Sequence, residues 1–197
     1  MNKNDDKSLI FFVAGLSVKA CGFSDDLRKF LKDYLCDEAP IFSVSLQEGD
    51  LDKERIWARE TSLREKGYET EYEDVYLESL ILLRKLSEML PLYDRMLMHG
   101  SCLSIDGKGI LFLAHSGVGK STHARRWREL FKDRVVMIND DKPFVEIKED
   151  GVYAYGSCWD GKHHLSTFGK CELRAICFLK RSLENKIESY PLEKIYG

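Results

Sequence analysis

The chain has 197 residues, of which 44% are apolar and 32% are charged, and its 30 Lys and Arg against 33 Asp and Glu leave a formal net charge of −3. This composition excludes a wholly disordered, collagen-like or coiled-coil chain, and the length predicts either one domain or one domain with a modest N-terminal extension. The near-neutral balance argues against a nucleic-acid binder or a membrane-surface protein, because either would carry a basic excess.

The six cysteines are scattered and form no Cys-x-x-Cys pair. A zinc site or a disulfide framework is therefore not expected, and free thiols in a reducing cytosol are. The longest early apolar run, residues 9–18, is too short to span a bilayer and is a poor signal peptide. We expect a soluble cytoplasmic protein.

The N-terminal half shows the apolar patterns of short strands and helices. The run at 9–14 predicts a buried strand, and the alternation over 41–46 predicts a half-buried one. Apolar residues at helical spacing predict a short amphipathic helix over 25–35 and a core helix with a leucine stripe over 76–90. Charges dominate residues 48–73 without a sustained period, so we expect irregular surface structure there.

The pattern changes from helical to strand-like near residues 91–96. This predicts a boundary between an N-terminal α/β region (1–95) and a second module (96–197). The second module opens with two apolar runs around the Asp-Gly pair at 106–107, and a similar unit recurs over 143–155. A tight Asp-Gly turn between apolar runs is typical of a β-hairpin, so we expect two antiparallel hairpins.

Between these hairpins, residues 114–121 (Ala-His-Ser-Gly-Val-Gly-Lys-Ser) follow a predicted strand and open a predicted helix. They fit the phosphate-loop or Walker A pattern, Gly-x-x-x-x-Gly-Lys-Ser/Thr, except that Ala114 replaces the first glycine. Glycines let backbone N–H groups converge on phosphate oxygens, while Lys120 reaches the β/γ-phosphates and Ser121 ligates Mg²⁺. A chance glycine-rich turn is the alternative. The expected nucleotide contacts are Ser116, Gly117, Val118, Gly119, Lys120, Ser121 and Thr122.

A strand predicted over 135–138 ends in Asn139-Asp140-Asp141. One carboxylate of this acidic pair (Asp140 and Asp141) can hold Mg²⁺, directly or through water, while the other accepts a proton from an attacking hydroxyl. The sequence leaves open which residue has which role. A strand-ending turn capped by Asp is the alternative, but the pair follows the lysine by one helix and one strand. We therefore predict both as catalytic residues and, with Ser121, as metal ligands.

Four segments together resemble the catalytic domain of HPr kinase/phosphorylase, which shares its fold with phosphoenolpyruvate carboxykinases: Met98-His-Gly-Ser, the Asp-Gly hairpin at 106–107, the loop at 116–121 and Asn139-Asp-Asp. With Trp159-Asp-Gly-Lys-His, the chain looks more narrowly like a bacterial group of uncharacterised HPr-kinase-like proteins, over about residues 95–182. The resemblance implies an α/β kinase fold with a mixed, largely antiparallel sheet and flanking helices. It also implies ATP and Mg²⁺ as cofactors.

The resemblance also carries residue roles. His99 matches a histidine near the acidic pair in HPr kinases, and Lys120 acts on the nucleotide. The cluster Trp159, Lys162 and His163 would close over phosphates or bind the acceptor, the alternative being a surface loop with a packed tryptophan. Thr122 stands where HPr kinases carry Glu, which weakens the case for HPr as substrate. Relatives usually continue further, so we expect a domain that is short at its C-terminus.

The sequence thus predicts an ATP-dependent, HPr-kinase-like phosphotransferase that moves the γ-phosphate to a hydroxyl of a protein, a peptide or a small molecule. One alternative is a regulatory module that binds ATP without transferring phosphate. Another is a P-loop ATPase, which the hairpin ahead of the loop disfavours. The expected partners are a nucleotide and an unidentified acceptor, without nucleic acid or membrane, and homo-oligomer formation stays open.

Overall fold

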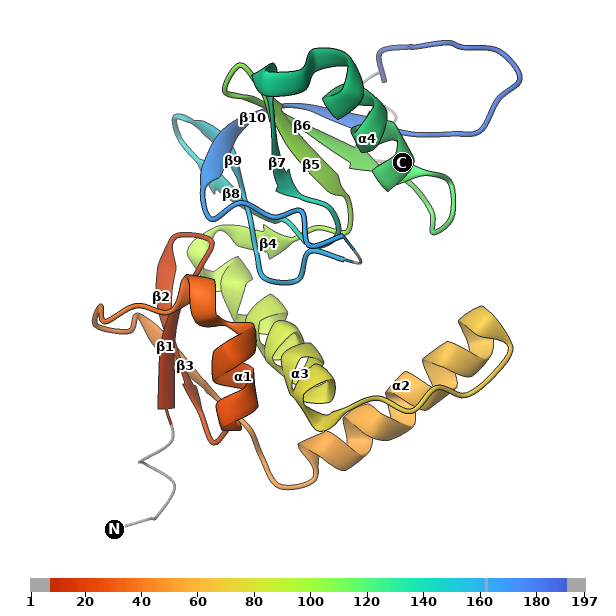
Figure 1. The fold of residues 1–197 in the computed structure, drawn as a ribbon. Coiled ribbons are helices and arrows are strands. Elements are labelled where there is room, and N and C mark those ends of the chain that lie inside the picture. The colour runs from red at the N-terminus through yellow and green to blue at the C-terminus, as the bar shows by residue number, and fades with distance from the viewer. Residues whose placement is uncertain (1–7, 162, 191–197) are drawn as a thin grey trace.

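The computed structural model of the protein describes residues 8–161 and 163–190, which form two β-sheets joined by helices (Figure 1). The smaller sheet has the strand order β1-β2-β3, and the larger one has seven strands in the order β4-β8-β9-β10-β6-β5-β7. In Figure 1 the small sheet lies below the large one, and α3 leads from the lower part to the upper. No helix in these residues combines the length and the apolar character needed to cross a bilayer.

The N-terminal part contributes β1 (Ser8–Val13), β2 (Leu16–Cys21), α1 (Asp25–Phe30), β3 (Phe42–Ser45), α2 (Asp50–Lys66) and α3 (Asp74–Met89), with 3-10 turns at Lys32–Tyr34 and Leu90–Tyr93. The remaining part contributes β4 (Arg95–Leu97), β5 (Ser101–Ile105), β6 (Lys108–Leu113), α4 (Lys120–Phe131), a 3-10 turn at Lys132–Arg134, β7 (Val135–Asn139), β8 (Phe144–Lys148), β9 (Gly151–Tyr155) and β10 (Lys170–Phe178). The predicted strands near 9–14 and 41–46 and the leucine-rich helix are confirmed as β1, β3 and α3.

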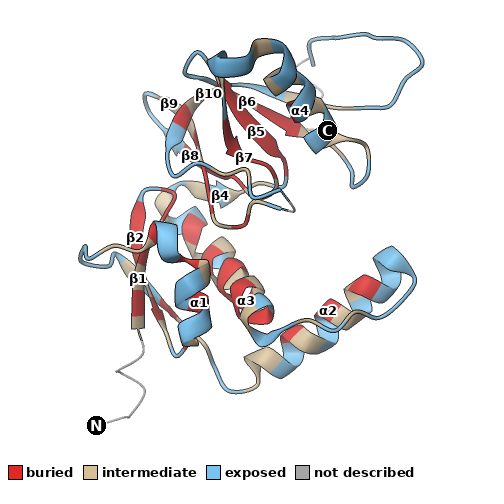
Figure 2. Ribbon diagram, viewed as in Figure 1, coloured by how far each residue is buried: buried red, intermediate tan, exposed pale blue. Residues whose placement is uncertain are grey.

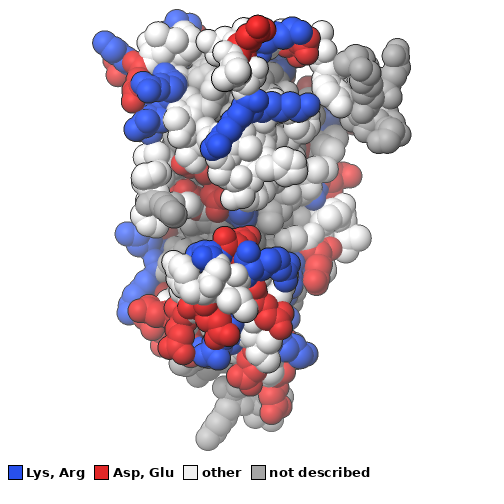
Figure 3. All heavy atoms as spheres, turned by 90° about the vertical axis from the view of Figure 1, so that its right-hand side faces the viewer, with Lys and Arg blue, Asp and Glu red and all other residues white. Residues whose placement is uncertain are grey.

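The prediction of irregular structure over 48–73 was wrong, because α2 is a 17-residue helix there. Its buried residues Glu54, Ala58 and Ser62 lie four apart on the side that packs against α3. They are small or polar, and Glu54 accepts two hydrogen bonds from Arg84 of α3. The buried face of α2 therefore shows no hydrophobic periodicity in the sequence. Figure 3 shows acidic and basic side chains intermixed over the lower half of the face toward which α2 projects.

Two smaller differences concern the first 45 residues. The helix expected over 25–35 ends at Phe30 and gives way to a 3-10 turn. Strand β2 was not predicted; it pairs antiparallel with β1 around a two-residue turn at Ala14 and Gly15, whose φ angles are 49° and 77°. Such left-handed pairs suit the twist of a tight hairpin.

Both predicted hairpins of the large sheet are confirmed. Strands β5 and β6 are antiparallel around Asp106 and Gly107, with φ angles of 48° and 80°, and β8 pairs antiparallel with β9. Strand β10, which was not predicted, pairs antiparallel with β9 and parallel with β6. The sheet is therefore mixed and largely antiparallel, as expected, and helices flank it.

The main core runs through both parts of the chain. Leu82 and Leu86 of α3 belong to one buried cluster with Phe144 of β8 and with Trp159, and Figure 2 shows buried residues along α3 and in both sheets. A polar contact also joins the parts, since Arg95 donates to the carbonyl of Ala14 at 2.8 Å. The division of the chain into 1–95 and 96–197 stays a prediction about domains.

The backbone at Gly156, just after β9, packs closely against the backbone of Ile138 in β7 and of Thr167. A Cβ at Gly156 would lie 2.0 Å from the backbone oxygen of Thr167 and 2.8 Å from that of Ile138. We expect Gly156→Ala to lower the free energy of unfolding by about 3 kcal/mol or more, because backbone must move to admit the methyl group. The matched control is Gly169→Ala, where a Cβ meets no atom within 4 Å, and the expected change is within about 0.5 kcal/mol. Equal urea midpoints for the two variants would contradict this account.

Candidate functional site

Four segments of the chain meet at one edge of the large sheet because of the strand directions. Strands β6 and β7 are both antiparallel to β5, which lies between them, and β10 is parallel to β6. The carboxyl ends of β6, β7 and β10 therefore share an edge with the start of β5. Neighbouring strands are about 4.8 Å apart, so the ends of β6 and β7 are separated by about 10 Å. The loop at 114–121 and the acidic pair leave the sheet at these two ends.

The loop at 114–121 has the backbone that its glycines predict. Gly117 and Gly119 adopt left-handed φ angles of 75° and 117°, and α4 begins at Lys120, as expected. Gly119 is the N-cap residue, and no side chain caps the helix. The first N–H groups of α4 are thus not satisfied by a side-chain cap, and the helix dipole adds partial positive charge there. This is the arrangement in which helix starts bind anions.

The polar residues of the loop lie in one continuous stretch. Lys120 folds back over the loop, since its Nζ donates to the carbonyl of Ala114 at 3.1 Å. Ser116, Ser121 and Thr122 are exposed. All the nucleotide contacts predicted from the sequence therefore lie on the loop and the first turn of α4.

Asn139 fixes the turn that carries the acidic pair. Its side chain is fully buried, and its Nδ2 donates to the backbone carbonyl and the hydroxyl of Ser157, both at 3.0 Å. Its Oδ1 accepts the backbone N–H groups of Asp141 at 2.8 Å and Lys142 at 2.6 Å. Asp140 is buried and accepts a 2.6 Å hydrogen bond from the hydroxyl of Ser101, at the start of β5.

Asp141 is the more accessible carboxylate and lies beside His99. Its Oδ1 is 3.2 Å from Nε2 of His99 and 3.1 Å from Nζ of Lys142. Burial by itself would raise the pKa of Asp141, but the hydrogen bond with His99 and the positive charge of Lys142 outweigh it and hold that pKa below its ordinary value. The side chain of His99 is 58% exposed. The structure thus brings together His99 and the acidic pair.

The segment around Trp159 flanks the acidic pair, but its tryptophan is packed inside. The indole of Trp159 is buried and donates to the backbone carbonyl of Ser79 in α3 at 3.1 Å, which matches the packed-tryptophan alternative. A Cβ at Gly161 would lie 3.3 Å from the Cβ of Asp141. The turn that contains Gly161 therefore borders the acidic pair. His163 is exposed, and Lys162 lies outside the described residues.

The residues present fit a Mg²⁺ ion that arrives with a nucleotide. Within 8–161 and 163–190, no group of three or more His, Cys, Asp or Glu residues could hold a metal ion by itself. Mg²⁺ is usually bound by one or two carboxylates together with water and substrate phosphates. The carboxylates of Asp140 and Asp141 and the hydroxyl of Ser121 are oxygen donors of this kind.

Sequence reasoning missed the residues that hold the acidic pair in place. Ser101 and Ser157 bond to Asp140 and Asn139, and Lys142 lies against Asp141. For Lys142, a basic residue directly after two carboxylates was a usable signal. Ser101 belongs to the Met98-His-Gly-Ser segment, but its contact with Asp140, like that of Ser157 with Asn139, depends on how the strands pair and had no local signal.

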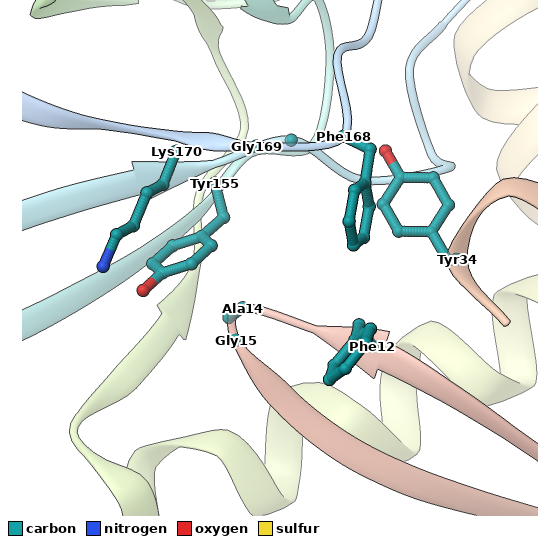
Figure 4. A pocket seen from close by; sticks show the side chains of 9 residues that line it. Phe12, Ala14, Gly15, Tyr34, Tyr155, Phe168, Gly169 and Lys170 are labelled. Atoms are coloured by element: carbon teal, nitrogen blue, oxygen red, sulfur yellow. The ribbon is translucent and has the colours of Figure 1, made fainter. Parts of the chain in front are cut away.

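An apolar cavity of about 310 Å³ lies apart from these residues, between the β1–β2 turn and the junction of β9 with β10 (Figure 4). Four aromatic side chains line it: Phe12, Tyr34, Tyr155 and Phe168. Burial raises the pKa of Tyr34 to about 12. Because the described lining has no carboxylate, we assign this cavity no role in the chemistry.

Comparison with known proteins gives a distant likeness in fold. No family model matches the sequence, and no curated protein matches it. Among solved structures, the HPr(Ser) kinase/phosphatase from Coxiella burnetii is similar over 49% of this chain and 67% of that one, with 14% sequence identity and a TM-score of 0.37. At this level of similarity, the function has to be inferred from the residues of the chain itself.

The lowered pKa of Asp141 predicts an acid-sensitive contribution to stability. A carboxyl group whose pKa is lower in the folded state stabilises that state above its unfolded pKa, about 4, and the contribution is lost as the pH falls through the folded value. We expect the difference in free energy of unfolding between the parent protein and Asp141→Asn to be constant above about pH 5 and to shrink at lower pH. His99→Gln should reduce the acid-sensitive part in the parent background. Denaturant titrations from pH 7 to 3 test this, and a difference that stays constant would contradict it.

Proposed function

We propose that the chain is an ATP-dependent phosphotransferase of the HPr-kinase-like type, which moves the γ-phosphate of ATP to a hydroxyl of an acceptor protein, peptide or small molecule. One observation carries the proposal: a glycine loop with an uncapped helix start and a pair of carboxylates leave the same sheet edge, two strands apart. Phosphoryl transfer needs an anion cradle together with metal-binding and proton-accepting oxygens that the bound nucleotide can reach.

The loop is assigned to binding. In this proposal the N–H groups of residues 116–121 hold phosphate oxygens, and Lys120 leaves the carbonyl of Ala114 to pair with the β/γ-phosphates. Exchanging a neutral carbonyl for a charged oxygen is favourable, because charge-assisted hydrogen bonds are the stronger ones. Mg²⁺ bound with the nucleotide would neutralise developing phosphate charge, and Ser121 and Asp140 are the residues that would hold it.

The two carboxylates are assigned different roles by their surroundings. Asp140 is buried, with Oδ1 bonded to Ser101, so its place suits a fixed ligand on the metal side. Asp141 is more exposed, and both of its side-chain contacts fall on Oδ1. Its Oδ2 is left to accept the proton of an incoming acceptor hydroxyl. Asp141 is therefore the proposed base, and His99 orients it.

Nucleotide binding is the first test. Saturating Mg·ATP, at about 100 times its Kd, should add about 2.7 kcal/mol to the free energy of unfolding and raise Tm by about 5–10 °C for a chain of this size. Lys120→Ala should remove most of the shift, while Arg125→Ala, on the exposed face of α4, should keep it. A parent protein that gives no shift and no heat of binding would refute the loop assignment.

Phosphoryl transfer is the second test. Asp141→Asn and Asp140→Asn should leave the nucleotide Kd within about tenfold of the parent value, since the loop contacts persist. Transfer of labelled γ-phosphate to candidate acceptors should fall by about 10²–10⁴-fold in Asp141→Asn, the usual cost of removing a general base. Asp140→Asn should also lower transfer, through loss of a metal ligand. Unchanged transfer in both variants would refute the mechanism. A parent protein that transfers only to water would be an ATPase, and one that binds without transfer would be a regulatory module.

A further inference from the structure

The segment that follows β10 runs beside the phosphate loop. Strand β10 pairs in parallel with β6, with Phe178 opposite Leu113, and the N–H of Leu179 donates to the carbonyl of Leu113 at 2.8 Å. The segments that follow β6 and β10 thus leave the sheet side by side. The first continues into the phosphate loop, and the second continues into Lys180 and Arg181. Parallel pairing alone brings these distant segments side by side.

Arg181 reaches the loop directly. Its Nη2 donates to the backbone carbonyl of Gly117, a residue 64 positions earlier in the chain. A guanidinium carries five N–H donors in a planar fork, and within residues 8–161 and 163–190 this is the single hydrogen bond that Arg181 makes. Most of its donors are therefore left for a ligand at the loop.

The charge of Arg181 is not compensated by the described residues. Neither Lys180 nor Arg181 forms an ion pair there, whereas Arg125 and Arg126 on α4 both pair with Glu129. An arginine that only braced a surface loop would gain from a carboxylate neighbour of this kind. A cation held on a loop and left without an anion is suited to a ligand that brings its own negative charge.

The strand order decides which end of a nucleotide Arg181 faces. In the order β10-β6-β5-β7, the acidic pair follows β7 on one side of the loop, and Arg181 follows β10 on the other. The phosphate that is transferred must lie toward the acidic pair, because the metal and the acceptor are there. Arg181 therefore lies toward the nucleoside end of the bound nucleotide.

We propose that Arg181 is a nucleotide-binding residue that pairs with the α-phosphate, the phosphate nearest the nucleoside, and that it contributes affinity without taking part in transfer. This inference rests on the proposed function, since it needs a nucleotide at the loop. When the nucleotide binds, Arg181 either gives up its hydrogen bond to the carbonyl of Gly117 or keeps it with one N–H group. The other N–H groups of the guanidinium donate to the phosphate oxygens. Arginine suits this place because its planar fork matches phosphate in two-point contact.

The test compares Arg181→Met, which removes the charge at similar length, with Arg181→Lys, which keeps the charge. Arg181→Met should raise the Kd of both Mg·ATP and Mg·ADP by about 10- to 100-fold, the range for a hydrogen bond to a charged group. Arg181→Lys should raise both by less than about tenfold. The matched control, Arg125→Met, should change neither. At saturating nucleotide, kcat for transfer should change by less than about threefold in both Arg181 variants, in contrast to the Asp141 variant.

Three outcomes would overturn the inference. Weakened ATP binding with unchanged ADP binding would mean a contact with the terminal phosphate. Equal weakening by Met and Lys, with a lower Tm of the free protein, would mean that Arg181 only braces Gly117. Unchanged affinity in Arg181→Met would mean no contact at all. All three outcomes require that the parent protein binds Mg·ATP. If the parent protein does not bind it, the proposed function itself is refuted. Binding by the parent protein therefore distinguishes failure of the proposed function from failure of the inference about Arg181.

Discussion

The pairing of β5 with β6 on one side and β7 on the other is the constraint on which the site depends. Both neighbours run antiparallel to β5, in registers that place Cys102 opposite Leu111 and Asn139. The carboxyl ends of β6 and β7 therefore reach the same edge of the sheet. This holds although a tight turn joins β5 to β6 and α4 lies between β6 and β7. A slip of one residue in either ladder would turn alternate side chains to the other face of the sheet and would separate Ser101 from Asp140.

Burial of a polar group then sets the direction of the chain at that edge. The fully buried amide of Asn139 has partners for both its nitrogen and its oxygen, and a buried amide that lost them would pay the full cost of desolvation. The turn after β7 is therefore held in one conformation. Asp140 points toward β5, and Asp141 remains accessible beside His99. The same turn is braced by Ser157, which links it to the segment that ends in Trp159.

The N-terminal part of the chain contributes to this arrangement through the core. Trp159 packs among side chains from α1 and β8, and its indole N–H is held by a carbonyl of α3. The turn that borders Asp141 is thus anchored on helices that precede the loop at 114–121 in sequence. Arg95 adds a second link by bonding both Ala14 of the β1–β2 turn and Glu146 of the large sheet. Residues far from the proposed chemistry consequently support its geometry.

The sequence by itself determined what depends on local spacing. Glycines at 117 and 119 with Lys120 and Ser121 specified the loop, the Asp-Gly pair at 106–107 specified its hairpin, and the leucine stripe specified α3, because turn geometry and periodic burial act within a few residues. Helix α2 was hidden because its buried face is small and polar. Only the tertiary structure decided the pairing of β10 with β6, the bond between Ser101 and Asp140, and the approach of Arg181 to the loop. These contacts join residues 39 to 65 positions apart, and they follow from strand order and register, which no local pattern encodes.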